Sequence, residues 1–599
     1  MASLSASETE KQRQLPRKSI DTLSGNRTET GTATATATAM ETLADVNAGK
    51  EDDGSNSKVH DRSSRTDDSG NDNDNDNDND NDNDNDNDNG LAPQRSNASS
   101  VWVAETMSLP REVLFVMICC MAQFCTQAAY METLVLLHVI GGSFNVDSPA
   151  RLAWLVAGYS LTVGTFILFS GRLGDAFGYK RMLVIGFAWF SLWSLVAGLS
   201  VYADFTLAVV SRVLQGVGPA ICLPNALALF GAAYPPGHRK AMVFSFFGAV
   251  APMGGVVGAA LASTLDLAWW PWALWALSAW LAVLAVAGWF IIPEPPAKLQ
   301  KQKLGGPPRG LRAMFVELDI PGAVTGVAAL VLFNFAWVQA PIDGWKTPAV
   351  LVPLVLGLAL FAVFAVVEFR FAPMPLLPFE VVNADVGFVL AAVVCGWATF
   401  GVWTLYLVQI LQEVRGLPPL LTCAWLSPVV VTGGLAAVIT GKLLGPLRVR
   451  PPVVMTMALV AFTVGIVLTA TAPADQPYWA QIFVSMLVMP FGMDMSFPAA
   501  TLILSDAVKR EHQGIGASLV NTVVNYGIAL GVGFAGTVEV HVNNGGRTQE
   551  DQFVGFRGAL YMGVGLAGLG LCVALTFLAR EWRHRGFEKD KESEKAAEA

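Results

Sequence analysis

Three ionisable side chains lie inside long apolar runs of this 599-residue chain, where an isolated charge is costly. Glu132 lies about six residues before the end of one run, and Arg212 about eight residues into another, which are similar depths in a bilayer. The two side chains can therefore alternate between pairing with each other and engaging a proton or a substrate. Asp494 lies near the middle of a third run, where an unpartnered carboxylate readily takes up a proton. These positions indicate proton coupling within a membrane.

Each of these residues also has a purely structural interpretation. Glu132 can face the outer water, and Arg212 can extend its guanidinium to the outer interface. Asp494 can bond to a neighbouring serine or backbone group at the kink made by Pro498. Gln215 lies one helical turn after Arg212, and we expect both to line a central cavity.

The runs that hold these residues belong to a set of about fourteen, each long enough to span a bilayer. Hydrophobic residues make up 53% of the chain and charged residues only 15%, against about 25% charged in average usage. We therefore predict an all-α, multi-pass membrane protein. The predicted spans are 112–138, 151–170, 182–201, 205–232, 241–265, 272–292, 320–340, 349–368, 385–411, 418–440, 453–471, 479–504, 514–538 and 556–579.

The charges between the spans predict how they are oriented. With the N-terminus inside, sixteen Lys and Arg residues fall in inner loops and five in outer loops, as the positive-inside rule requires. Both termini are then cytoplasmic. The first thirty residues contain no apolar segment typical of a cleaved signal peptide, so we expect an internal helix to direct insertion.

The first hundred residues account for the acidity of the chain. They hold 10 basic and 21 acidic residues, a net charge of −11, whereas the whole chain has −10. We predict that residues 1–105 are a disordered cytoplasmic tail, with an Asn-Asp repeat at 71–89 that is either a tolerated expansion or a regulatory, cation-binding segment. The cysteines lie in apolar runs and the histidines are scattered, so we expect no metal site and no cofactor.

The loop between the second and third spans has glycines and charges at fixed spacing. Gly178 permits a tight turn, and Asp175 can cap a helix or pair with Arg181 to latch the cytoplasmic side. An ordinary basic loop would explain Lys180 and Arg181 but not the glycines or the aspartate. The predicted gate motif comprises Gly171, Gly174, Asp175, Gly178, Lys180 and Arg181.

The fifth span is rich in small residues around a proline. Small residues let helices approach closely, and Pro252 predicts a kink, so close packing alone is one interpretation of this span. The pattern also resembles an antiporter motif, although Ala251 replaces its glycine before the proline. The residues concerned are Gly248, Pro252, Gly254, Gly255 and Gly258.

Together with Arg-x-x-Gln-Gly-x-Gly from Arg212 to Gly218, these motifs resemble the major facilitator superfamily. The arrangement of six, two and six spans resembles its 14-helix drug:proton antiporter branch, and the stretches at 223–225 and 494–498 resemble fungal aminotriazole-resistance and low-affinity ammonium transporters. The resemblance implies two six-helix bundles around a central site. The predicted parts are 106–297 (first bundle), 298–319 (cytoplasmic linker), 320–370 (two inserted helices), 371–580 (second bundle) and 581–599 (charged cytoplasmic tail).

The resemblance implies a non-enzymatic secondary transporter that exports a toxic organic compound or secondary metabolite in exchange for protons. Alternatives are a facilitator or symporter for a small solute such as ammonium or borate, and a transporter-like receptor. No phosphate-binding Gly-Lys-Thr loop supports an ATP-driven mechanism. The expected partners are a small-molecule substrate, protons and the lipid bilayer, without nucleic acid. We expect a monomer, in the plasma membrane rather than the vacuole.

Overall fold

The computed structural model describes residues 103–598 except 236, 294–309, 311–313, 317, 377–382 and 508–512. Residues 1–102 of the predicted acidic tail and most of the predicted linker 298–319 lie outside the described residues. The described part of the chain is built from helices and contains no strand. The predicted all-α fold is confirmed.

Fourteen helices of the described residues are long and apolar enough to cross a bilayer, as predicted. The N-terminal half contains α2 (Leu109–Val135), α4 (Pro149–Leu152) continued by α5 (Trp154–Phe177), α6 (Tyr179–Leu199), α7 (Phe205–Ala233), α8 (His238–Asp266) and α9 (Pro271–Ile291). The inserted pair is α12 (Ile320–Asp343) and α13 (Pro348–Val366). The C-terminal half contains α14 (Ala384–Gln409), α15 (Pro419–Leu426) continued by α16 (Pro428–Leu444), α17 (Pro451–Thr471), α18 (Gln481–Ala507), α19 (Gln513–Val542) and α20 (Gln549–Glu598).

Local sequence signals account for several helix ends. The side chain of Asp204 accepts a hydrogen bond from the Leu207 amide at 2.9 Å and so caps α7. Asn383 caps α14 in the same way, through the Val386 amide at 2.8 Å. α5 ends at Gly178, whose φ of 98° is a conformation that favours glycine.

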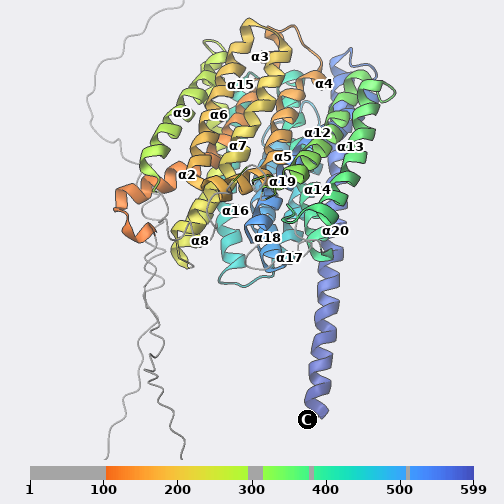
Figure 1. The fold of residues 1–599 in the computed structure, drawn as a ribbon. Helices are drawn as coiled ribbons and strands as arrows, with labels where there is room; N and C mark the ends of the chain where they lie inside the picture. Colours follow the sequence, from red (N-terminus) through yellow and green to blue (C-terminus); the bar gives the residue numbers. More distant parts are fainter. Residues whose placement is uncertain are drawn as a thin grey trace, which may run out of the picture. The chain divides into compact units, whose positions relative to one another are not determined.

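The last helix extends well beyond its predicted span. The sequence predicts a span at 556–579 followed by a charged tail, whereas α20 continues as one helix to Glu598 (Figure 1). Apolar residues end near Leu578, but Glu, Lys, Arg and Ala are strong helix formers, so the helix does not end with them.

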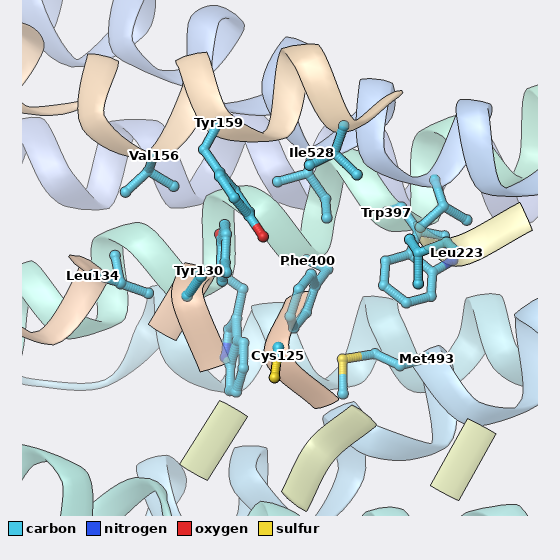
Figure 2. Packing of buried hydrophobic residues seen from close by; sticks show 14 of the residues in the cluster. Cys125, Tyr130, Leu134, Val156, Tyr159, Leu223, Trp397, Phe400, Met493 and Ile528 are labelled. Atoms are coloured by element: carbon cyan, nitrogen blue, oxygen red, sulfur yellow. The ribbon is translucent and has the colours of Figure 1, made fainter. Parts of the chain in front are cut away.

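The two halves meet mainly at two places. α5 packs against α19, and α8 packs against α15 and α16. The first contact is close because Gly164 lies directly against the α19 backbone, where an added Cβ would come within 2.6 Å of the Tyr526 nitrogen. Figure 1 shows α5 and α19 side by side between the halves. The core between them holds side chains from α2, α5, α7, α14, α18 and α19 (Figure 2).

Candidate functional site

A cavity lies between the two halves of the bundle. Its walls come from α2 and α8 in the N-terminal half and from α14, α15, α16 and α18 in the C-terminal half. Most lining side chains are apolar; Gln127, Thr404 and Asp494 are the polar ones. Within the described part of the chain, no three or more His, Cys, Asp or Glu side chains gather as a metal site. An apolar lining with a few polar groups is typical of a site for an organic molecule.

Aromatic side chains on α14 form one wall of this cavity. Trp397, Phe400 and Trp403 recur every third residue, so they share a helix face. The indole nitrogen of Trp397 donates to Ser496 Oγ at 3.2 Å, and that of Trp403 donates to Ser485 Oγ at 3.0 Å. These bonds satisfy the polar edges of the rings and leave apolar surface for the cavity. This wall was not predicted, although the three-residue spacing is visible in the sequence.

Asp494 places a carboxylate on the cavity wall formed by α18. It lies on α18 between two helix-interior prolines, Pro490 and Pro498. Its Oδ2 atom is buried and has no hydrogen-bond partner among the described residues. Ser496, which the structural interpretation would pair with it, instead donates to the Met493 carbonyl at 3.1 Å. An unpaired carboxylate beside an apolar cavity is a costly arrangement that indicates function.

The prolines and glycines around Asp494 bring the halves together. Gly433 of α16 lies between Asp494 and Pro252, and an added Cβ would be 3.1 Å from Asp494 Oδ2 and 2.8 Å from Pro252 Cγ. Pro252 belongs to the predicted antiporter-like helix, α8, and it also lines the cavity. The structure therefore places two predicted site residues, Asp494 and Pro252, on either side of one glycine.

The other small residues of α8 pack against α2. A Cβ on Gly254 would overlap the Phe124 carbonyl oxygen, and a Cβ on Gly258 would lie 2.5 Å from Ala128 Cα. Gly255 faces Met131 and lines the cavity with it. Gly248 differs, because nothing lies within 4 Å of its Cβ position. Close helix packing thus explains three of these four glycines.

Arg212 and Gln215 lie inside the N-terminal half and are not among the residues that line the cavity. The Arg212 guanidinium donates to the Leu155 and Ala129 carbonyls, each at 3.1 Å, and to the Gln215 side chain. It also lies 4.4 Å from the centre of the Tyr159 ring. The structure differs here from the prediction, because the guanidinium bonds to carbonyls of α2 and α5 rather than facing the cavity.

Glu132 is buried on α2, with 4% of its surface exposed. Its Oε1 atom has no hydrogen-bond partner among the described residues. The Arg212 guanidinium binds the Ala129 carbonyl, which lies three residues earlier on the same helix. The hydrogen bonds of the guanidinium go to the Leu155 and Ala129 carbonyls and to Gln215. The predicted exchange between Glu132 and Arg212 stays a prediction.

The predicted gate motif occupies the junction of α5 and α6. Gly174 lies so close to α7 that a Cβ would overlap the Asn225 side chain, and Gly178 provides the turn. The Tyr179 hydroxyl donates to the exposed Asp175 carboxylate at 2.6 Å. Lys180 lies 5.7 Å from the Trp289 ring, and Arg181 is exposed. The predicted latch between Asp175 and Arg181 stays a prediction.

Contacts between the halves also occur at the end that the loop charges predict to be extracellular. His138 and Glu413 form an ion pair at 2.9 Å, and the Gln412 side chain donates to the Val135 carbonyl at 2.8 Å. Deeper in the bundle, the hydroxyls of Tyr130 and Thr404 are 2.9 Å apart. Figure 2 shows Tyr130 beside Phe400. None of these contacts was predicted, because they join residues more than 270 positions apart.

A further buried acid was also missed. Glu539 of α19 is 4% exposed and accepts a hydrogen bond from the Tyr406 hydroxyl at 2.8 Å. The predicted span ended at residue 538, so Glu539 was assigned to a loop. A span limit one turn later would have revealed it as an intramembrane acid.

Comparison with known proteins identifies the family. A sequence model of the Major Facilitator Superfamily matches residues 119–532 and 443–598. The chain belongs to the major facilitator superfamily. It is therefore an integral, multi-pass secondary transporter, as the motifs in α5, α7 and α8 predicted.

Several relatives of this transporter come from fungi. A low affinity ammonium transporter of Saccharomyces cerevisiae is 50% identical over 78% of this chain and 89% of its own length. The efflux pump terJ of Aspergillus terreus is 42% identical over 80% of this chain and 90% of its own length. The crystal structure of a peptide transporter in complex with alafosfalin has a TM-score of 0.56 at 16% identity, covering 78% of this chain and 94% of that one. That likeness shows the fold alone.

Proposed function

We propose that this transporter exports a toxic organic compound or secondary metabolite in exchange for protons, by alternating access of the cavity between its halves. One observation carries the proposal: an apolar, aromatic cavity contains an unpaired carboxylate, Asp494, next to the helix contact made by Pro252 and Gly433. The aromatic wall supplies affinity for an apolar or aromatic molecule. The carboxylate supplies a proton-binding position.

Asp494 couples the proton to the movement of the halves. When its carboxylate is charged, it is unfavourable in a closed apolar contact, so a hydrated or cation-occupied cavity is preferred. When it is protonated, α16 and α8 can pack tightly across Gly433. Glu132 and Arg212 are two further ionisable side chains, and both lie within the N-terminal half. Together these groups let protonation bias one packing of the two halves over the other.

The efflux pump of Aspergillus terreus, 42% identical over most of both chains, supports the direction of transport. The excess of basic residues in the predicted inner loops supports cytoplasmic termini. We further propose that the protein works as a monomer in the plasma membrane, because export protects a cell only if the compound leaves it.

The test is growth of an efflux-deficient yeast on a panel of toxic organic compounds, borate and methylammonium. Cells would express the wild type, Asp494→Asn, or the control Asp475→Asn, which changes an exposed aspartate in the loop between α17 and α18. We expect the wild type and the control to confer resistance to one class of organic compound, and Asp494→Asn to lose it at equal protein level. Equal resistance in all three strains would contradict the role of Asp494.

Ammonium uptake is the second candidate, because the ammonium transporter is 50% identical over most of both chains. The same growth panel separates the two functions. Uptake would make cells more sensitive to methylammonium, whereas export would leave them unchanged or resistant. Heightened sensitivity without resistance to any organic compound would overturn the export proposal.

A further inference from the structure

Three helices of the N-terminal half, α2, α6 and α9, meet at the end that the loop charges predict to be cytoplasmic. Their contact is close at Gly288 of α9, where an added Cβ would lie 3.4 Å from Val184 of α6 and 3.7 Å from Ile118 of α2. α9 ends one turn later, at Ile291. The start of α2 and the start of α6 therefore lie beside the end of α9.

Three basic residues lie around this end of α9. Arg111, in the first turn of α2, donates from Nε to the Ile291 carbonyl at 3.1 Å. Lys180, in the first turn of α6, places its Nζ 5.7 Å from the centre of the Trp289 ring. Arg181 follows in the same turn, and its side chain is exposed. A helix-end carbonyl and an aromatic ring attract cations, but neither carries a full negative charge. We call Arg111, Lys180 and Arg181 the basic cluster.

No ion pair joins the basic cluster to a carboxylate in the part of the chain that the structure describes. Two acids close by in the sequence have other partners. Glu112 accepts from Arg239 Nη2 at 2.7 and 2.8 Å and from the Tyr234 hydroxyl at 2.9 Å. Asp175 accepts from the Tyr179 hydroxyl at 2.6 Å. Three cations at one helix end without an acid between them favour an anionic ligand.

An exposed apolar surface begins directly beside the basic cluster. Ile185, one turn after Arg181 on α6, is 51% exposed, and Phe290 of α9 is 73% exposed. Trp289 is also exposed, as is typical of tryptophan at the edge of a membrane. In a membrane span such side chains face acyl chains. A ligand that fits both surfaces therefore has an anionic head and apolar chains.

We propose that the basic cluster binds the headgroup of an anionic phospholipid of the cytoplasmic leaflet, with the acyl chains along Ile185 and Phe290. The arginine guanidinium groups match phosphate oxygens in geometry, and the Lys180 ammonium adds a third charge. A soluble anion would meet the same charges but would leave the apolar surface unused. The inference does not depend on the transported compound or on the direction of transport.

The test is lipid binding by the purified full-length protein in detergent, measured by native mass spectrometry. The probes are phosphatidylserine, phosphatidylcholine and the soluble headgroup glycerophosphoserine, at equal concentrations. The variant combines Arg111→Gln, Lys180→Gln and Arg181→Gln, which removes the charges of the basic cluster and keeps side chains of similar polarity. We expect it to bind phosphatidylserine at least about tenfold more weakly than the wild type, because each cation near an anionic membrane surface contributes about 1 kcal/mol.

The matched control combines Arg370→Gln, Lys442→Gln and Arg583→Gln, which removes three exposed charges elsewhere on the predicted cytoplasmic side. We expect the control to bind phosphatidylserine as the wild type does. Phosphatidylcholine and glycerophosphoserine should bind weakly to every protein. Equal binding of phosphatidylserine by the triple variant and the wild type would overturn the proposal. Wild-type binding of phosphatidylcholine or glycerophosphoserine as strong as that of phosphatidylserine would also overturn it.

Arg181→Gln alone provides the comparison if the triple variant does not elute as a single folded species. Its side chain is exposed, so the substitution should leave folding intact, and we expect about threefold weaker binding of phosphatidylserine. Unchanged binding would contradict the proposal. Binding of a synthetic peptide of residues 71–89, without binding of phosphatidylserine, would assign the basic cluster to the acidic tail instead. No transport is measured, so the result is separate from a failed transport assay.

Discussion

The residues around Asp494 combine three properties that rarely occur together. The carboxylate is unpaired, a glycine separates it from a proline of the opposite half, and aromatic rings line the same cavity. Each property has a cost: desolvation of the acid, conformational freedom of the glycine and loss of a helix hydrogen bond at the proline. Their coincidence at one contact between the halves is the basis on which we propose a coupling role for this position.

Gly433→Ala tests that contact. The added methyl would meet Pro252 Cγ at 2.8 Å, and the proline ring cannot move aside easily, so we expect a loss of about 1–3 kcal/mol in stability and a loss of transport. The control is Gly434→Ala, whose Cβ position has nothing within 4 Å. Thermal unfolding in detergent and growth under the selecting compound would measure the two effects. Equal behaviour of the two variants would show that α16 does not pack on α8 as described.

Single residues were predictable where their chemistry was unusual for their surroundings. Asp494, Glu132 and Arg212 are charges in apolar runs, so the sequence alone indicated them. Trp397, Phe400 and Trp403 were missed because aromatic residues are common in membrane spans, and only the cavity distinguishes these. For Arg212, the depth within the membrane span was predictable from the sequence. Its hydrogen bonds to carbonyls of α2 and α5 were not, because they depend on tertiary packing.

At the scale of elements, α8 and α2 illustrate how small residues determine helix spacing. Gly258 faces Ala128 so closely that no side chain fits between the backbones. Gly258→Ala should therefore lower stability by about 1–3 kcal/mol, since α8 must move away from α2.

Gly248→Ala, on the same helix with open space at its Cβ position, is the matched variant and should change stability little. The midpoint of thermal unfolding in detergent compares the two. A larger effect at Gly248 than at Gly258 would contradict the described packing.

Helix number and order were predictable because a bilayer requires long apolar segments, and that requirement is readable residue by residue. The end of α20 was not predictable in this way. The residues after the apolar segment are no longer apolar, but they still favour a helix, so α20 continues. The position of α12 against both halves of the bundle was not predictable either. It depends on contacts such as that between Tyr526 and Leu330, which lie almost two hundred residues apart.

At the scale of the whole molecule, contacts at the predicted extracellular end hold the halves together. His138 with Glu413, and Gln412 with Val135, must separate before the cavity can open on that side. Glu413→Ala removes the acidic partner of the ion pair, so we expect the population of molecules open to the outside to rise.

The readout is labelling of Met131→Cys, a position that lines the cavity, in a protein from which the exposed thiol of Cys572 has been removed. An impermeant maleimide is added to whole cells that express this protein. Labelling should increase at least about twofold in Glu413→Ala. It should stay unchanged in Glu550→Ala, which alters an exposed acid at the start of α20. Equal labelling of all variants would mean that the ion pair does not restrain opening.

The most direct test of proton-coupled export is efflux of the selected compound from loaded cells, with the proton gradient intact or collapsed by a protonophore. We predict that collapse slows efflux by the wild type at least about tenfold, and that Asp494→Asn at equal protein level is slow under both conditions. Efflux that ignores the gradient, or that Asp494→Asn leaves at the wild-type rate, would contradict the account.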